Sequence, residues 1–114
     1  MDNKEKRKIN ELLRSVVMLE NTGEAKRFFR DLLTEKEIAE FSNRWRAAVL
    51  LSRKVSYAAI IKETGLSSTT VARVSQWLWR GKGGYRLILD KIESKNKTGG
   101  KRGKKKKRSN KKKR

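Results

Sequence analysis

Eight polar and basic side chains near one another in the sequence carry the most recognisable binding chemistry of this 114-residue chain. Four are consecutive hydroxyl residues, which donate and accept hydrogen bonds, and four are cations that suit phosphate groups. Between Glu63 and Asp90 there is no acidic residue to neutralise them. The chemistry indicated is the binding of a phosphate-rich polyanion whose bases also offer polar edges. The residues are Ser67, Ser68, Thr69, Thr70, Arg73, Arg80, Lys82 and Arg86.

The composition leaves little for catalysis or for holding a metal. The chain contains no cysteine and no histidine, so it lacks thiol nucleophiles, imidazole bases and the usual transition-metal ligands. The glycine-rich run Gly81–Gly84 lacks the spacing of a nucleotide-binding loop, and we interpret it as a helix stop. We therefore expect neither an enzyme nor a metal or other cofactor.

The elements that must position the eight side chains are predicted between residues 56 and 78. Ser56 can cap a first helix, and Gly65 lies where a left-handed turn would end it. Ser67 or Ser68 can cap a second helix, whose apolar residues recur at intervals of three and four. This pattern is typical of a helix-turn-helix, which lays its second helix in the major groove of DNA. The expected buried side chains are Ala58, Ala59, Ile60, Ile61, Val71, Val74 and Leu78.

In this arrangement the eight side chains would divide into two groups. The hydroxyls of residues 67–70 would lie at the N-terminal end of the recognition helix, within reach of base edges and phosphates. Hydroxyls discriminate bases poorly, and no Arg, Asn or Gln, the strong bidentate readers, precedes Arg73 in that helix. The four cations would clamp phosphates. We expect a modest sequence preference, partly through groove shape; a packed helix pair that binds no nucleic acid is the alternative interpretation.

The rest of the chain predicts an all-α fold with six helices in all. Thr34 and Glu37 form a capping box, and the chain has no proline that would interrupt a helix. The further helices are predicted over residues 4–19, 24–33, 34–52 and 85–92. The side chains expected in the core of these helices include Phe28, Phe29, Phe41, Trp45, Leu87, Ile88 and Ile92.

The amount of apolar surface predicts a homodimer. Residues 1–93 form one small helix-turn-helix domain, and its short helices carry more apolar side chains than one copy can bury. A dimer would also space two recognition helices one turn of DNA apart, about 34–36 Å. In the alternative interpretation the first two helices close the core of a monomer.

Residues 94–114 differ in composition from the rest of the chain. They contain 13 Lys and Arg and no Asp or Glu, whereas residues 1–93 carry 19 basic against 12 acidic residues. The segment has no apolar side chain to bury, so we expect a disordered tail that binds nucleic acid without sequence preference. A solubilising extension is the alternative.

The hydropathy pattern argues against a membrane protein, and together with the expected DNA binding it predicts a cytoplasmic protein associated with the nucleoid. The longest unbroken apolar run, Ala47–Leu51, is far shorter than the ~20 residues that span a bilayer. No secretory signal follows the charged start of the chain, because polar residues interrupt its apolar positions.

Three segments between residues 28 and 89 carry a family resemblance. They are FFRDLLTEKEIAEFSNRWRAAVLL, SYAAIIKETGLSSTTVARVSQWL and GKGGYRLIL. In them the chain resembles the Trp repressor superfamily, and most of all its small branch labelled YerC/YecD-like. The resemblance implies an intertwined homodimer with a shared helical core, and a turn and recognition helix within residues 65–79. It also implies a repressor that binds operator DNA once tryptophan lies beside that helix.

The tryptophan site implied by the resemblance is only partly present. Thr34, Arg44 and Arg73 fall at positions where the repressor holds its ligand. Val74 and Trp77 stand where the repressor has a glycine and a serine, and their larger side chains would fill the ligand pocket. We therefore expect a vestigial pocket and DNA binding without a small-molecule corepressor.

Three functions follow from these patterns. The leading interpretation is a transcriptional regulator that binds double-stranded DNA as a dimer through its helix-turn-helix. The first alternative is a nucleoid-associated or RNA-binding protein in which the basic tail dominates binding. The second is a protein-interaction module whose helix-turn-helix no longer reads DNA.

Overall fold

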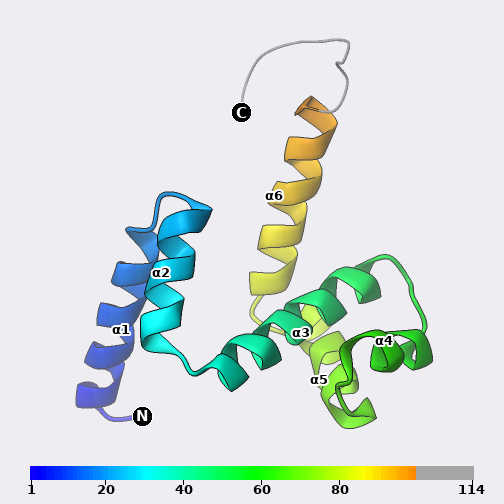
Figure 1. Cartoon of the computed structure of the whole chain (residues 1–114), viewed down its shortest axis with the longest axis horizontal. Helices are drawn as coiled ribbons and strands as arrows, with labels where there is room; N and C mark the ends of the chain where they lie inside the picture. Colours follow the sequence, from blue (N-terminus) through cyan, green and yellow to red (C-terminus); the bar gives the residue numbers. More distant parts are fainter. Residues whose placement is uncertain (100–114) are drawn as a thin grey trace. The chain divides into compact units, whose positions relative to one another are not determined.

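The computed structural model describes residues 1–99 of the chain, and the side chains of residues 1–96. Within this part every regular element is a helix, so the predicted all-α, six-helix fold is confirmed. No helix of residues 1–99 combines the length and apolarity needed to cross a membrane. The helices are α1 (Asn3–Val17), α2 (Thr22–Leu32), α3 (Glu35–Ser52), α4 (Tyr57–Thr64), α5 (Ser68–Arg80) and α6 (Gly84–Gly99), labelled in Figure 1.

Side-chain caps explain where most of these helices begin. The carboxylate of Asp2 accepts from the Glu5 backbone N–H at 2.9 Å, and the Asn21 side chain caps α2 in the same way. At α3 the predicted capping box is confirmed. The Thr34 N–H donates to Glu37 Oε1 at 2.9 Å, and the Glu37 N–H donates to Thr34 Oγ1 at 3.1 Å. These bonds satisfy backbone donors that a helix start leaves without partners.

The chain divides into two compact units, residues 1–41 and residues 42 onward. In the first unit, α1 and α2 contain no buried residue, although both helices are strongly amphipathic. The Phe28 and Phe29 rings are half-buried and lie 5.6 Å apart. The prediction of a core position is wrong for Phe41 in the single chain, because 46% of this residue is exposed. One copy therefore leaves the apolar surface of its first unit largely uncovered.

The second unit has a fully buried core built from α3, α4 and α5. Its residues are Ala47, Ala48, Leu50, Leu51, Ile60, Val71, Val74 and Leu78. In α4 the prediction holds for Ile60 and in part for Ile61, but Ala58 and Ala59 are exposed. The reason is that this short helix turns one narrow stripe, Ile60 and Thr64, toward the core. The core thus joins the two helices of the predicted helix-turn-helix to the end of α3.

Helix α6 differs from prediction in burial and in length. Leu87, Ile88 and Ile92 were expected in the core but are 55%, 44% and 45% exposed, because α6 packs against the core of the second unit through Tyr85 and Leu89 instead. The helix also extends to Gly99, so the first six residues of the predicted disordered tail are helical. Extending an existing helix requires no new nucleation, and no breaking residue intervenes before Gly99. The remaining tail residues, 100–114, lie outside the described residues.

Candidate nucleic-acid interface

The turn between α4 and α5 is held by backbone geometry and one buried hydroxyl. Gly65 has a left-handed φ of 74°, and its N–H donates to the Ile61 carbonyl at 2.8 Å. Thr64 Oγ1 donates to the Ile60 carbonyl at 2.8 Å and accepts from the Leu66 N–H at 3.2 Å. Glycine adopts this φ at no steric cost. The two helices are therefore joined rigidly, as a helix-turn-helix requires.

The four hydroxyl residues at the start of α5 do not have equal roles. Ser67 is the N-cap: its Oγ accepts from the Thr70 N–H at 3.1 Å and donates to Thr70 Oγ1 at 3.0 Å. The side chains of Ser67 and Thr70 are thus already hydrogen-bonded within the cap. Ser68 and Thr69 are exposed in the first turn of the helix. They are the two hydroxyls best placed to reach a base edge.

An exposed stripe runs along α5 on the side away from the core. Thr69, Arg73, Gln76 and Arg80 are spaced by four, three and four residues and all are exposed. This spacing places them on one face of the helix. Gln76 was not predicted as a site residue, although its side-chain amide can form two hydrogen bonds with an adenine base. Its place opposite the buried stripe was the signal that could have found it.

The turn after α5 requires glycine and leads directly to the last predicted cations. A Cβ atom on Gly81 would lie 2.5 Å from the Trp77 carbonyl oxygen, which only the absence of a side chain avoids. Gly83 has a positive φ of 88°. Lys82 in this turn and Arg86 in the first turn of α6 are both exposed. The basic side chains therefore continue from α5 through the turn into α6.

The residues of the predicted vestigial pocket have different surroundings. Val74 is fully buried in the core, whereas Trp77 is 45% exposed, so within one chain they do not fill the same space. Arg73 is exposed on α5, and Arg44 is half-buried on α3. Thr34 is engaged in the capping box of α3. The larger side chain at position 74 thus packs α5 against the core.

An aromatic contact fixes the start of α6 on α3. The rings of Trp45 and Tyr85 lie 6.2 Å apart with their planes 30° from parallel. Burial raises the pKa of the Tyr85 hydroxyl above its ordinary value of 10.0, and the positive charge of Arg44 opposes this with a smaller effect. Tyr85 is therefore neutral at physiological pH. This contact holds the position from which Arg86 projects.

An ion pair connects α3 to the first helix of the helix-turn-helix. Arg46 Nε donates to Glu63 Oε2 at 2.6 Å. Both side chains are nearly half exposed, so solvent screens the pair and its contribution to stability is small. Its effect is to neutralise Glu63, the last carboxylate before the acid-free segment.

Lys54 is a candidate site residue that sequence reasoning missed. It follows the end of α3 with a φ of 66° and, within residues 1–99, is the one non-glycine residue in the left-handed region. The Lys54 N–H donates to the Leu51 carbonyl at 3.0 Å and the Val55 N–H to the Leu50 carbonyl at 3.1 Å. This is the Schellman pattern, in which glycine usually occupies the left-handed position. A lysine there costs about 1–2 kcal/mol.

The side chain of Lys54 lies against Trp79 near the end of α5. Its Nζ is 5.6 Å from the centroid of the indole ring, and Cζ of Arg86 is 5.4 Å from the same ring. Trp79 is 48% exposed. The sequence left open whether this ring stacks on bases or joins a core. In the structure it carries two cations at cation–π distance.

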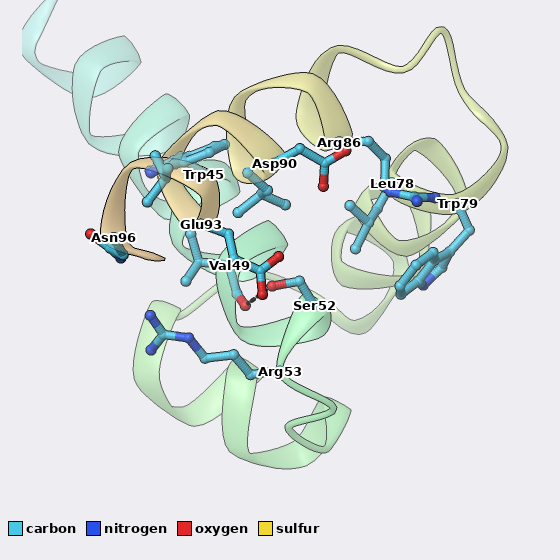
Figure 2. A pocket seen from close by; sticks show the side chains of 12 residues that line it. Trp45, Val49, Ser52, Arg53, Leu78, Trp79, Arg86, Asp90, Glu93 and Asn96 are labelled. Atoms are coloured by element: carbon cyan, nitrogen blue, oxygen red, sulfur yellow. Dashed lines mark hydrogen bonds between the residues drawn. The ribbon is translucent and has the colours of Figure 1, made fainter. Parts of the chain in front are cut away.

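Beside this cluster lies a hollow of about 500 Å³ between α3, α5 and α6. Figure 2 shows Trp45 and Trp79 at opposite ends of it, with the Ser52 Oγ donating to the Val49 carbonyl at 2.6 Å. The carboxylates of Asp90 and Glu93 line it as well. The guanidinium groups of Arg53 and Arg86 line it too, so the four charges largely cancel and the hollow offers a phosphate no net positive charge.

Comparison with known proteins identifies the family. The sequence profile described as Trp repressor protein matches residues 7–93. The chain belongs to the Trp repressor family. The resemblance predicted from the three sequence segments is thereby confirmed. Because this family is regulatory and not catalytic, membership points to a DNA-binding helix-turn-helix regulator.

Relatives of this chain share both its sequence and its fold. The uncharacterised protein YerC of Bacillus subtilis strain 168 is 33% identical over 87 residues, which cover 76% of this chain and 84% of YerC. A crystal structure of a TrpR-like protein from Eubacterium eligens superposes with a TM-score of 0.74 at 31% identity. The matched region covers 81% of this chain and 96% of the Eubacterium eligens chain.

A second solved structure agrees with the first. A Staphylococcus aureus protein described as a candidate Trp repressor superposes with a TM-score of 0.72 at 34% identity. The match covers 82% of this chain and 96% of the other. Because 96% of each solved chain is matched, the six helices correspond to nearly a whole Trp-repressor-like fold.

Proposed function

We propose that this protein is a transcriptional regulator that binds double-stranded DNA as a homodimer through α4 and α5, without tryptophan as a corepressor. The observation that carries the proposal is the exposed stripe of α5. Thr69, Arg73, Gln76 and Arg80 share one face of a capped helix, in a segment of 26 residues without a carboxylate. A helix with this surface suits the major groove and its flanking phosphates.

Ligand-independent binding is supported by the burial of Val74. The Trp repressor keeps a glycine at this place, where its ligand lies beside the recognition helix. Here the valine is fully buried among core residues of α3 and α4. A side chain already packed there holds α5 in one orientation without a bound molecule. The active form in this proposal is the apo form.

The homodimer is supported by apolar surface that one chain leaves uncovered. Large apolar side chains of α1, including Leu13 and Val17, are 53% and 81% exposed, and three more on α6 are about half exposed. Uncovered apolar surface of this extent is typical of a protein–protein interface. A second copy, related by a two-fold axis, would cover the same faces on both chains.

Selection of bound duplexes from a random pool, in tryptophan-free buffer, tests the regulator proposal. We expect enrichment of a two-fold symmetric sequence with half-sites about 10 base pairs apart. Adding tryptophan at micromolar concentration should leave the affinity for that duplex unchanged. Tightening by tryptophan would contradict the ligand-free mechanism, and recovery of unselected sequences alone would contradict sequence reading.

A second candidate function rests on the charge of residues 94–114, which contain 13 basic residues and no acidic one. In this second candidate function, the protein coats nucleoid DNA or binds RNA in the cytoplasm mainly through these basic residues. A variant that ends at residue 99 separates the two candidates and keeps all of α6. We expect it to retain its preferred duplex while its salt dependence flattens, because each phosphate that the tail no longer neutralises removes about 0.9 from the slope. Complete loss of binding would favour the second candidate.

A further inference from the structure

The conformation of Lys54 suggests that its side chain has a role beyond the fold. The left-handed position after α3 is one that glycine occupies with less strain. Its backbone hydrogen bonds, to Leu51 and from Val55 to Leu50, need no lysine side chain. Lysine at this place therefore supplies a positive charge at the expense of local backbone stability.

The cluster formed by Lys54, Trp79 and Arg86 joins three segments of the chain. The two cations lie 5.6 and 5.4 Å from the centre of the Trp79 ring, one from the turn after α3 and one from α6. Because indole has no net charge, it orders both cations without neutralising them. Two positive charges are thus held next to the C-terminal end of the recognition helix.

The surroundings of Trp79 determine from which side an anion can approach. On one side is the hollow of Figure 2, whose lining includes Asp90 and Glu93. A second hollow lies between α4 and α5. Its lining contains no carboxylate and consists of Tyr57, Ala72, Ser75, Gln76, Trp79 and Arg80. A phosphate would meet hydroxyl, amide and guanidinium groups without an opposing carboxylate in the second hollow, whereas in the first Asp90 and Glu93 offset Arg53 and Arg86.

We propose that Lys54 and Arg86, positioned by Trp79, bind the phosphate backbone of duplex DNA beside the segment contacted by α5. The backbone would pass along the Trp79 ring, between Arg86, which lines the first hollow, and Arg80, which lines the second. This inference rests on the proposed function and extends its contact surface to the turn after α3. Trp79 acts as a positioning residue, and the two cations make the contacts.

The variant Lys54→Gly tests the contact with a built-in control for folding. Glycine suits the left-handed backbone, so we expect an unchanged or higher melting temperature. Removing one phosphate contact should lower the slope of log affinity against log salt by about 0.9. At 0.1 M salt this corresponds to a loss of about eightfold in affinity. The preferred sequence should not change. Lys54→Asn, which also tolerates this conformation, should behave alike.

A charge-matched control is Lys8→Ala in α1, which also removes one positive charge from an exposed position. We expect its salt slope to equal that of the parent. An equal fall in Lys8→Ala and Lys54→Gly would overturn the inference, since the effect would then be one of net charge.

Two changes at Trp79 test its positioning role. Trp79→Leu removes the aromatic face, so both cations lose their platform and the salt slope should fall by between one and two contacts, about 0.9–1.8. Trp79→Phe keeps an aromatic face and should restore most of the slope. A purely structural role would lower the melting temperature in Trp79→Leu and leave the salt slope of the folded protein intact, which would overturn the inference.

The same titrations separate this inference from the proposed function. Failure of the parent protein to bind any duplex would overturn both. Sequence-preferring binding by the parent, with identical salt slopes in Lys54→Gly and the parent, would overturn the phosphate contact alone and leave the reading helix in place.

Discussion

Thr69 and Arg73, four residues apart on α5, allow single side chains to be tested for base reading and for phosphate binding. Both are exposed on the same face, and Thr69 lies nearer the capped end of the helix. Thr70, in contrast, has its hydroxyl engaged with Ser67. Readout of bases should therefore depend more on Thr69 than on Thr70.

We expect Arg73→Ala to weaken binding to all duplexes by a similar factor and to lower the salt slope by about 0.9, because phosphates are alike in every sequence. Thr69→Ala should instead change the relative preference among duplexes, by about 1–3 kcal/mol for each base whose readout is disrupted. Competition binding with a panel of single-base variants measures both effects. The reverse pattern would mean that Arg73 reads bases.

Tyr85 gives a pH dependence at the alkaline end. Burial raises the pKa of its hydroxyl in the folded protein above 10.0, so the folded state favours the protonated form. The stability that this provides is complete below pH 10 and is lost as the pH rises through the folded-state pKa. In Tyr85→Phe the unfolding free energy should fall less steeply above pH 10 than in the parent. Denaturant titrations from pH 8 to 11, with Tyr57→Phe as an exposed control, would detect the difference.

At the level of helices, Val74 is the middle one of three buried residues, Val71, Val74 and Leu78, that pack α5 against the core. It is fully buried, whereas Trp77, one turn further on, is 45% exposed. The combined change Val74→Gly with Trp77→Ser should therefore open a cavity at position 74. Reduced burial and the added glycine together should destabilise the chain by about 3 kcal/mol.

DNA binding by that double variant tests whether α5 needs a bound ligand in order to bind DNA. We expect weaker DNA binding in the absence of ligand, and partial recovery when tryptophan or another indole fills the cavity. Calorimetry with free tryptophan and DNA titrations with and without it provide the measurements. Trp77→Ser alone serves as the control and should bind DNA like the parent. Unchanged DNA binding by the double variant would argue against a locking role for Val74.

Local features of the helices could be predicted from the sequence, and features that depend on packing could not. The capping box of Thr34 and Glu37 and the turn at Gly65 were predicted because each involves residues three or four apart. The exposure of Ala58 was not predicted, because helical spacing cannot say which neighbouring element covers a face. The role of Lys54 was missed for a related reason: no residue pattern marks a lysine in a position that favours glycine.

For the molecule as a whole, exposed apolar side chains on α6 allow a test of dimer formation. Ile88→Glu places a charge on a face that is 44% exposed in one chain. In a monomer this change would be nearly neutral, whereas in a dimer it would bury an unpaired carboxylate and weaken association. Sedimentation equilibrium should show a dimer for the parent and a shift toward monomer for Ile88→Glu. Glu93→Lys, exposed on another side of the same helix, should leave the parent's state unchanged.

The core of the second unit also has a consequence for the order of folding. Its buried residues all come from positions 47–78, so every contact closes a short stretch of chain. Low contact order of this kind is typical of domains that fold within microseconds to milliseconds. The α4–α5 pair should thus form in a fast step whose rate is independent of protein concentration, before any slower, concentration-dependent pairing of two chains. Under the proposed function, a newly made chain would therefore form its DNA-reading surface before it pairs with a second copy.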